Sequence, residues 1–474
     1  MEFEAIIGLE IHVEMNTVSK MFSTGPVTFG KEPNTQVNVN DMAFLGTMPS
    51  LNKQAVVHAI RLSNALNMEI DKTIMFERKN YFYSDLPKGY QITQQYRPIG
   101  KNGYLNIKIG KDEKQIGIEK LHMEEDTCKQ IHLKDCSLLD YNRAGIPLIE
   151  IVSKPNMRSG EEAAKYVEKM RSIVSFLGVS NGKMEEGSMR CDVNISLKEK
   201  GTAKLGAKVE IKNLNSLANI QKAVEYEIAR QSSILKKGEM VQQDTRRFDE
   251  TSQTTVQMRF KTESEDYKYF TEPNIPPIRL TDEFVEDAIR TSPELAESRQ
   301  KRYEKLGLNE YDSSLLLTSK EKSDYFEKVG ETGANPKLAA NWINGDVQSY
   351  LNKNNISINE FNISPNHLGA LIKLIESNVI SNKQARAMFE KMLEKDEDPI
   401  RLVDELDFNQ ISDENKLLTL INELLDQNPQ LIMEYKSGKD RVLGFFMAQI
   451  MKKTQGKANP TLTNKLLIQE INRR

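Results

Sequence analysis

Residues 8–15, GLEIHVEM, alternate between apolar and polar side chains, and this period of two is typical of a β-strand with one buried face. Leu9, Ile11 and Val13 lie on one side of such a strand. The other side carries two carboxylates and an imidazole, from Glu10, His12 and Glu14. This segment therefore predicts a sheet with an apolar side for the core and a polar side that gathers acids and histidine.

The same pattern recurs in RCDVNIS (190–196) and AKVEIKN (207–213), whereas PLIEIVS (147–153) is almost entirely apolar around Glu150. A carboxylate in such surroundings needs a partner or loses its charge. If these strands share one sheet, one face is lined by Glu10, His12, Glu125, Glu150, Asp192 and Glu210. Carboxylates with one imidazole suit Mg²⁺ or Mn²⁺. For any single alternating strand, a solvated outer face is the alternative.

Residues 121–129, LHMEEDTCK, place His122 two positions before three consecutive acids. Like charges this close repel one another in a strand, so either solvent or a bound cation must make the run tolerable.

The chain changes character along its length. Strand and helix patterns mix over roughly the first 270 residues, and amphipathic helices dominate from about residue 282 onward. The proline-rich TEPNIPPIRL (271–280) separates the two parts. Ser364 and Ser381 are predicted helix N-caps, and Gln384 completes a capping box with Ser381. The predicted class is therefore α+β, with a mixed-sheet domain ahead of all-helical domains.

Composition restricts the class of protein. The chain has 474 residues, 28% of them charged, and a net charge of −3, as in an ordinary globular protein. Its three cysteines lack a CxxC spacing, which argues against a disulfide framework or a structural zinc site and favours the cytoplasm. We find no signal peptide, no apolar run long enough to cross a membrane, and no P-loop, GxGxxG, HExxH or GxSxG motif.

The C-terminal segment is basic. Residues 436–474 contain nine basic and two acidic residues, a net charge of +7, which leaves −10 for the rest of the chain. A basic helical tail on an acidic body indicates a polyanionic partner, with a solvated basic helix as the alternative.

Ten segments in order along the chain resemble one family, the B subunits of the aspartyl/glutamyl-tRNA(Asn/Gln) amidotransferases. They are GLEIHVEM (8–15), FERKNYFYSDLPKGYQITQ (76–94), LHMEED (121–126), DYNRAGIPLIEIVS (140–153), KMEEGSMRCDVNIS (183–196), EIKNLNS (210–216), QDTRRFDE (243–250), YKYFTEPNIPP (267–277), ANWINGDV (340–347) and GFFMAQIMKKTQGKANP (444–460). The resemblance runs from residue 3 to the C-terminus. It implies a catalytic domain similar to glutamine synthetase over residues 1–293, a helical domain over 294–405, and a tRNA-binding tail similar to the YqeY family over 406–474.

The resemblance also implies a cytoplasmic ligase that forms C–N bonds. With ATP and Mg²⁺, the B subunits phosphorylate the side-chain carboxylate of Glu-tRNA(Gln) or Asp-tRNA(Asn). Ammonia that the amidase (A) subunit releases from glutamine then displaces phosphate, and a small third (C) subunit completes a heterotrimer. Misacylated tRNA is the expected nucleic-acid partner, and neither DNA nor a membrane is expected. Some relatives carry paired CxxC motifs, which this chain lacks, so no structural zinc is expected.

Carried over residue by residue, the resemblance assigns catalysis and metal binding to Glu10, His12, Glu125 and Glu150, with Asp192 and Glu210 at a second cation position. In the acidic run it thus implies Glu125 as the cation ligand, with Glu124 and Asp126 in the surrounding shell or facing solvent. It places Lys79 and Lys88 at the exit of an ammonia channel, although surface lysines are the alternative. Arg190, Arg246 and Arg247 are candidates for the ATP phosphates, with ordinary ion pairs as the alternative. For tRNA contact we expect Lys452, Lys453, Gly456 and Lys457.

Two further functions fit an acidic metal site beside a basic tail. A metal-dependent nuclease also places paired cations on carboxylates, and it predicts RNA cleavage with metal alone. A non-catalytic scaffold that presents tRNA to an amidase predicts that the acidic residues are dispensable for amidation.

Overall fold

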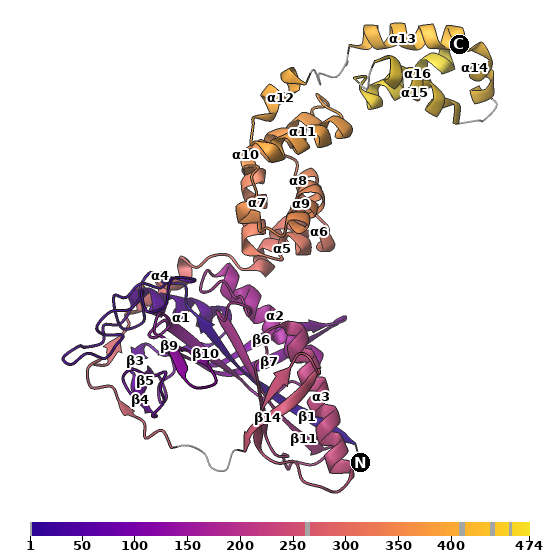
Figure 1. The fold of residues 1–474 in the computed structure, drawn as a ribbon. Coiled ribbons are helices and arrows are strands. Elements are labelled where there is room, and N and C mark those ends of the chain that lie inside the picture. Colours follow the sequence, from indigo (N-terminus) through magenta and orange to yellow (C-terminus); the bar gives the residue numbers. More distant parts are fainter. Residues whose placement is uncertain (1, 261–265, 407–412, 437–440, 455–456) are drawn as a thin grey trace. The chain divides into compact units, whose positions relative to one another are not determined.

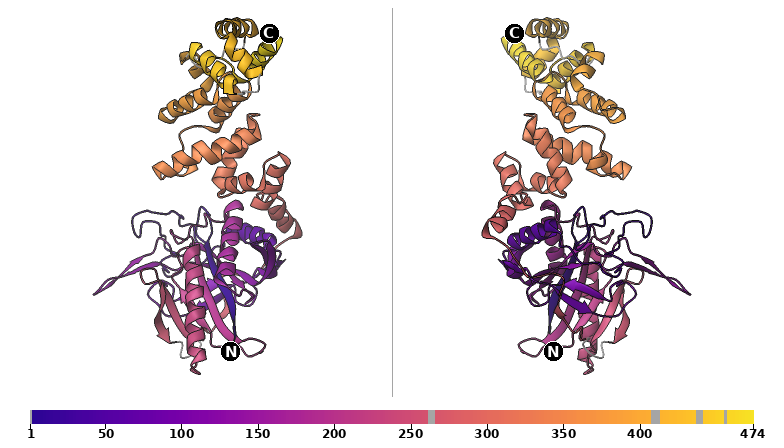
Figure 2. Two further views of the ribbon diagram at one scale, coloured as in Figure 1. Left: turned by 90° about the vertical axis from the view of Figure 1, so that its right-hand side faces the viewer. Right: turned by 90° about the vertical axis from the view of Figure 1, so that its left-hand side faces the viewer.

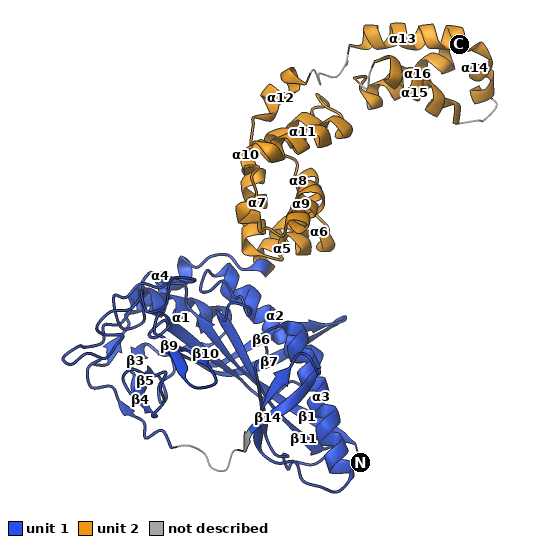
Figure 3. Ribbon diagram, viewed as in Figure 1, with its two compact units in different colours: residues 1–296 blue, residues 297–474 orange. Residues whose placement is uncertain are grey.

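The computed structural model describes residues 2–260, 266–406, 413–436, 441–454 and 457–474 (Figure 1). The chain divides into two compact units, residues 1–296 and 297–474 (Figure 3). The domain divisions predicted after residues 293 and 405 stay predictions.

A mixed sheet forms the centre of the first unit. Within the described residues it has nine strands, in the order β14-β13-β12-β11-β1-β10-β7-β6-β2. Their bounds are β1 (Phe3–Glu14), β2 (Glu69–Ile70), β6 (Gly100–Ile109), β7 (Asp112–Glu125), β10 (Pro147–Ser153), β11 (Met189–Glu199), β12 (Val209–Lys212), β13 (Asp244–Asp249) and β14 (Thr254–Phe260). Neighbouring strands are antiparallel except for β12 and β13, which are parallel. The alternating segment at the N-terminus is thus an interior strand, bonded to β11 and β10.

One face of this sheet is apolar and covered by helices. Leu9, Ile11 and Val13 are buried there, as the alternation predicted. Helices α1 (Lys53–Ala65), α2 (Gly160–Phe176) and α3 (Leu217–Lys236) contribute buried residues to the same core. The views in Figure 2 show α3 running along the sheet. The helices therefore leave the opposite, polar face of the central strands for the site described below.

Short strands extend the first unit beyond the main sheet. A three-stranded sheet has the order β15-β4-β5, with β4 (Glu77–Asn80), β5 (Tyr90–Thr93) and β15 (Phe270–Thr271). Two strand pairs join β3 (Thr73–Ile74) to β16 (Ile278–Arg279) and β8 (Lys129–His132) to β9 (Ser137–Asp140). Helix α4 (Asp282–Arg290) follows. The small three-stranded sheet matters for function because β5 lies against the end of β7.

The described part of the second unit is helical, which confirms the predicted class. Its helices are α5 (Ala296–Lys305), α6 (Glu310–Leu316), α7 (Lys320–Glu331), α8 (Pro336–Trp342), α9 (Gln348–Asn354), α10 (Pro365–Glu376), α11 (Asn382–Glu394), α12 (Pro399–Glu405), α13 (Glu414–Gln427), α14 (Pro429–Lys436), α15 (Arg441–Lys453) and α16 (Pro460–Arg473). Ser364 and Ser381 cap α10 and α11, and Gln384 completes the predicted capping box. Two separate apolar cores form, one within residues 303–403 and one within 417–471.

None of the described helices combines the length and the apolar composition that crossing a membrane requires.

Candidate active site on the polar face of the sheet

The strand register brings an imidazole, a carboxylate and a second imidazole into one row across three strands. His12 of β1 is opposite Glu150 of β10, which in turn is opposite His122 of β7. Both imidazole Nε2 atoms lie 3.4 Å from Glu150 Oε2. Residues far apart in the chain thus meet because their strands are neighbours, and the partner that Glu150 needed is a pair of histidines.

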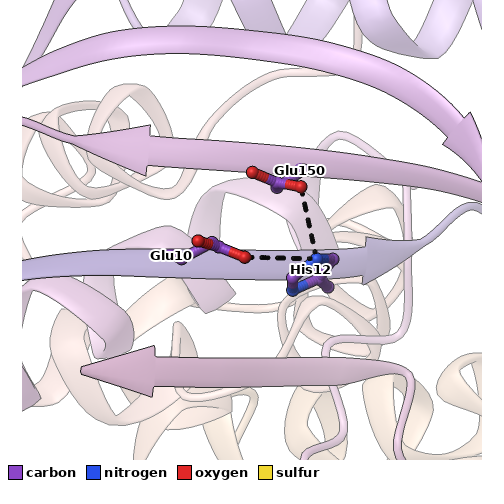
Figure 4. A group of neighbouring side chains, drawn as sticks. All are labelled: Glu10, His12 and Glu150. Carbon is purple, nitrogen blue, oxygen red and sulfur yellow. Dashed lines mark ion pairs between the residues drawn. The ribbon is translucent and has the colours of Figure 1, made fainter. Parts of the chain in front are cut away.

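Two more carboxylates complete this acidic cluster, which we define as Glu10, His12, His122, Glu124 and Glu150. His12 Nε2 lies 3.7 Å from Glu10 Oε1 (Figure 4) and 3.9 Å from Glu124 Oε1. His122 Nε2 lies 3.6 Å from Glu124 Oε2. In each of two sets, Glu10–His12–Glu150 and His122–Glu124–Glu150, the potential ligand atoms lie within 4.8 Å of one another. Hard oxygen donors with imidazole nitrogen fit Mg²⁺ or Mn²⁺, so this donor set is compatible with the predicted cations.

Burial and charge act against each other in the cluster. Burial lowers the pKa of His122, but the carboxylates of Glu150 and Glu124 outweigh it and raise the pKa to about 9. Burial also lowers the pKa of His12, but the neighbouring carboxylates, chiefly that of Glu150, outweigh it and raise this pKa. Although burial would raise the pKa of Glu150, the two histidines hold it well below its ordinary value. A cation that binds an imidazole nitrogen here must therefore displace a proton.

Glu125, the predicted ligand, is not brought to this cluster. Side chains alternate along β7, so Glu124 faces His12 and His122 whereas Glu125 points away from them. The Glu125 carboxylate pairs with Lys88 and accepts a hydrogen bond from the Ile92 N–H at 2.9 Å. Glu124 thus takes the place that we expected for Glu125, and the shared face of His122 and Glu124 could have indicated this from the sequence.

The Lys88–Glu125 pair lines a cavity of about 330 Å³. Other parts of its wall come from the irregular segment 40–49, which includes Asp41, Phe44 and Met48. Lys88 is therefore placed beside Glu125. Burial lowers the pKa of Lys79, on β4, but nearby charges, chiefly the carboxylate of Glu124, outweigh it and raise that pKa.

The predicted second cation position holds a lysine. Asp192 of β11 and Glu210 of β12 lie on the polar face, and the Lys212 Nζ atom is 2.6 Å from Asp192 Oδ2 and 3.1 Å from Glu210 Oε1. The structure brings the two carboxylates together as expected, but an ammonium group lies between them. Lys212 and Glu210 are two residues apart in β12, so their side chains lie on the same face of the strand. The ion pair between them could therefore be predicted from the sequence.

The three arginines proposed for phosphate binding lie in different surroundings. Arg190 is on the polar face, with Nη2 2.5 Å from Asp126 Oδ2. Arg246 faces the helices, where it contacts Glu227 at 3.2 Å and Asp244 at 2.9 Å. Arg247 is exposed and stands opposite Lys212 in the parallel pair, on the polar side. The structure therefore does not bring Arg246 to the site, because the alternation of β13 places it on the same face as the buried Phe248, where it joins an ion-pair network.

The predicted tRNA contacts lie on and after α15. Lys452 and Lys453 are exposed in its last turn, and Lys453 Nζ lies 3.5 Å from Glu423 Oε2. Lys457 is half-buried, and Gly456 lies outside the described residues.

Comparisons with known proteins match nearly the whole chain. Residues 5–286 match the family model described as GatB/GatE catalytic domain, and residues 324–471 match that described as GatB domain. The chain is 49% identical to the B subunit of the aspartyl/glutamyl-tRNA(Asn/Gln) amidotransferase from Geobacillus thermodenitrificans, over the full length of both chains. It is also 49% identical over full length to the protein of that name from Bacillus licheniformis.

Proposed function

Since the chain belongs to the family of aspartyl/glutamyl-tRNA(Asn/Gln) amidotransferase B subunits, we propose that it activates the amino acid on a misacylated tRNA for amidation. The substrate is Glu-tRNA(Gln) or Asp-tRNA(Asn). An oxygen of its side-chain carboxylate attacks the γ-phosphorus of ATP, and the bond between that phosphorus and ADP breaks. Ammonia then attacks the carbonyl carbon of the acyl phosphate, phosphate leaves with the bonding electrons, and an amide results.

The observation that carries this proposal is the acidic cluster on the polar face. A carboxylate is a poor electrophile, and its phosphorylation brings several negative charges together. Divalent cations held by Glu10, His12, Glu124 and Glu150 would supply the positive charge that phosphoryl transfer needs. The residues of the chain itself position the reactants: Arg247 is an exposed guanidinium on the same side, suited to a forked contact with a phosphate.

The source of ammonia lies outside this chain. We propose that an amidase subunit releases it from glutamine, that a small third subunit completes a cytoplasmic heterotrimer, and that ammonia reaches the site past Lys88 and Lys79. The cavity beside the Lys88–Glu125 pair supports this route. Lys452 and Lys453 are proposed to contact the phosphates of the tRNA.

The test is ADP release by the chain assembled with its partner subunits. We expect release that depends on Glu-tRNA(Gln) or Asp-tRNA(Asn), and its loss by at least about a hundredfold in Glu150→Gln and Glu124→Gln. Glu119→Gln is the matched control, because Glu119 lies on β7, the strand of Glu124, but is exposed. Glutaminase activity should persist in all three variants.

Two outcomes would support the other functions. Cleavage of RNA by the wild-type complex with Mg²⁺ alone would indicate a nuclease. Normal amidation by Glu150→Gln would indicate a scaffold that only presents tRNA.

A further inference from the structure

Four tyrosines pack against one another beside the acidic cluster, and two of them lie close to an ammonium group. We define this tyrosine cluster as Tyr81, Tyr96, Tyr267 and Tyr269. Its rings meet edge to face: the centroids of Tyr81 and Tyr267 are 5.8 Å apart, those of Tyr267 and Tyr269 are 5.9 Å apart, and those of Tyr96 and Tyr269 are 6.4 Å apart. Lys79 Nζ lies 5.0 Å from the Tyr267 ring centroid and 5.7 Å from that of Tyr81.

The small three-stranded sheet sets this arrangement. Arg78 of β4 pairs with Phe270 of β15, so the next residue towards the C-terminal end of β4, Lys79, comes opposite Tyr269. Asn80 extends the contact, because its N–H donates to the Tyr267 carbonyl at 3.1 Å. On the other face, Arg78 lies over the rings of Tyr90 and Phe270. The tyrosine-bearing segment is thus fixed to β4 from both sides of the sheet.

The cluster adjoins the reacting groups. Thr93 lies on β5, which pairs with β4, and its hydroxyl donates to Glu124 Oε2 at 3.2 Å. The face that carries Lys79 and the tyrosines therefore meets the acidic cluster at Glu124. An aromatic surface at this place is adjacent to the groups to which we assign phosphoryl transfer.

Core packing does not explain these rings. None of the four belongs to the apolar core of the first unit, and Tyr96 is 63% exposed. Tyr81, Tyr267 and Tyr269 are half-buried around a lysine. Aromatic side chains with a cation among them, next to a phosphate-handling site, are a setting in which nucleic-acid bases stack.

We propose that the tyrosine cluster binds an adenine ring. This inference rests on the proposed function, because both substrates assigned there carry an adenine: ATP, and the tRNA whose 3′-terminal adenosine bears the amino acid. The ring stacks on Tyr267 or Tyr269, and Lys79 lies close enough to contact the adjoining phosphate or ester.

The two sources of adenine are separated with fluorescent probes on the assembled complex. 2-Aminopurine riboside triphosphate reports the nucleotide, and tRNA ending in 2-aminopurine in place of its terminal adenine reports the acceptor end. Stacking on tyrosine quenches 2-aminopurine, so quenching in one arm identifies the source. Quenching in neither arm with the wild-type complex overturns the proposal, whatever the variants do.

Substitution gives a second measurement. Tyr267→Leu and Tyr269→Leu should raise the KM of the identified substrate by about tenfold, which is the size expected for one lost stacking contact. Tyr267→Phe and Tyr269→Phe keep the ring and should stay within about twofold of wild type. Tyr311→Leu, an exposed tyrosine of the second unit, is the matched control.

The outcomes distinguish this inference from the proposed function. Leucine variants with unchanged KM values for both substrates, or phenylalanine variants as impaired as leucine ones, overturn adenine stacking. A wild-type complex that never releases ADP with any misacylated tRNA contradicts the proposed function instead, while the fluorescence still tests the stacking.

Discussion

Arg246 and Arg247 are adjacent in sequence but have different surroundings. Replacing Arg246 by methionine should therefore lower stability, whereas replacing Arg247 should weaken the use of ATP. Arg246 is largely buried and contacts Glu227, a carboxylate that is 0% exposed. When Arg246 is removed, Glu227 keeps Arg230 at 2.8 Å and Gln231 at 2.9 Å. The loss of stability should therefore not exceed the lower end of the range known for breaking a buried ion pair. We expect Arg246→Met to lower the free energy of unfolding by about 3 kcal/mol.

Arg247→Met should leave stability unchanged, because Arg247 is exposed and has no ion pair among the described residues. If it holds a phosphate of ATP, losing a charge-assisted hydrogen bond of about 2 kcal/mol should raise the KM for ATP by more than tenfold. Denaturant unfolding and ADP-release kinetics on both variants measure the two effects. The reasoning is refuted if Arg246→Met weakens ATP use without loss of stability, or if Arg247→Met destabilises the fold.

Three further expectations follow from single contacts. Lys322 is buried with the Gln348 amide as a hydrogen-bond partner at 2.8 Å, and burial lowers its pKa from 10.5 to about 8. The folded state thus disfavours the charged form of Lys322, so Lys322→Met should increase the free energy of unfolding at pH 7 by no more than about 3 kcal/mol. Because the folded wild-type protein loses this proton above about pH 8 and the unfolded chain only above about pH 10.5, the gain should shrink between these two values. Denaturant unfolding at a series of pH values measures it. Lys212→Met removes the ammonium between Asp192 and Glu210 and should tighten Mn²⁺ binding by about tenfold in a calorimetric titration, with no change if that pair never meets a cation. Lys88→Met leaves the Glu125 carboxylate without its cation and should lower glutamine-dependent amidation while glutaminase activity persists; equal loss of both activities would place Lys88 elsewhere in function.

Alternation within single strands could be read from the sequence. It correctly divided β1 into an apolar face with Leu9, Ile11 and Val13 and a polar face with Glu10 and His12. The helical second part and its caps were also predictable, because N-caps are local hydrogen bonds within a few residues.

The arrangement of site residues that come from different strands could not be predicted from the pattern of any single strand. The row of His12, Glu150 and His122 requires the order and register of three strands, which single-strand patterns do not contain. The exchange of Glu125 for Glu124 is different, since the strand period alone distinguishes them. The same holds for Arg246 and Arg247, because the period of β13 places Arg246 on the face of the buried Phe248 and Arg247 on the other face.

The interior position of β1 has a consequence for how the protein is made. Its residues are synthesised before those of its two partners, β10 and β11, which end at Ser153 and Glu199. The nascent chain must therefore keep β1, with its apolar face, without either partner until β10 has been translated, which takes on the order of ten seconds, and without the second partner until β11 follows. Translation restarted at Met15 would omit the strand altogether and leave β10 and β11 without the element between them.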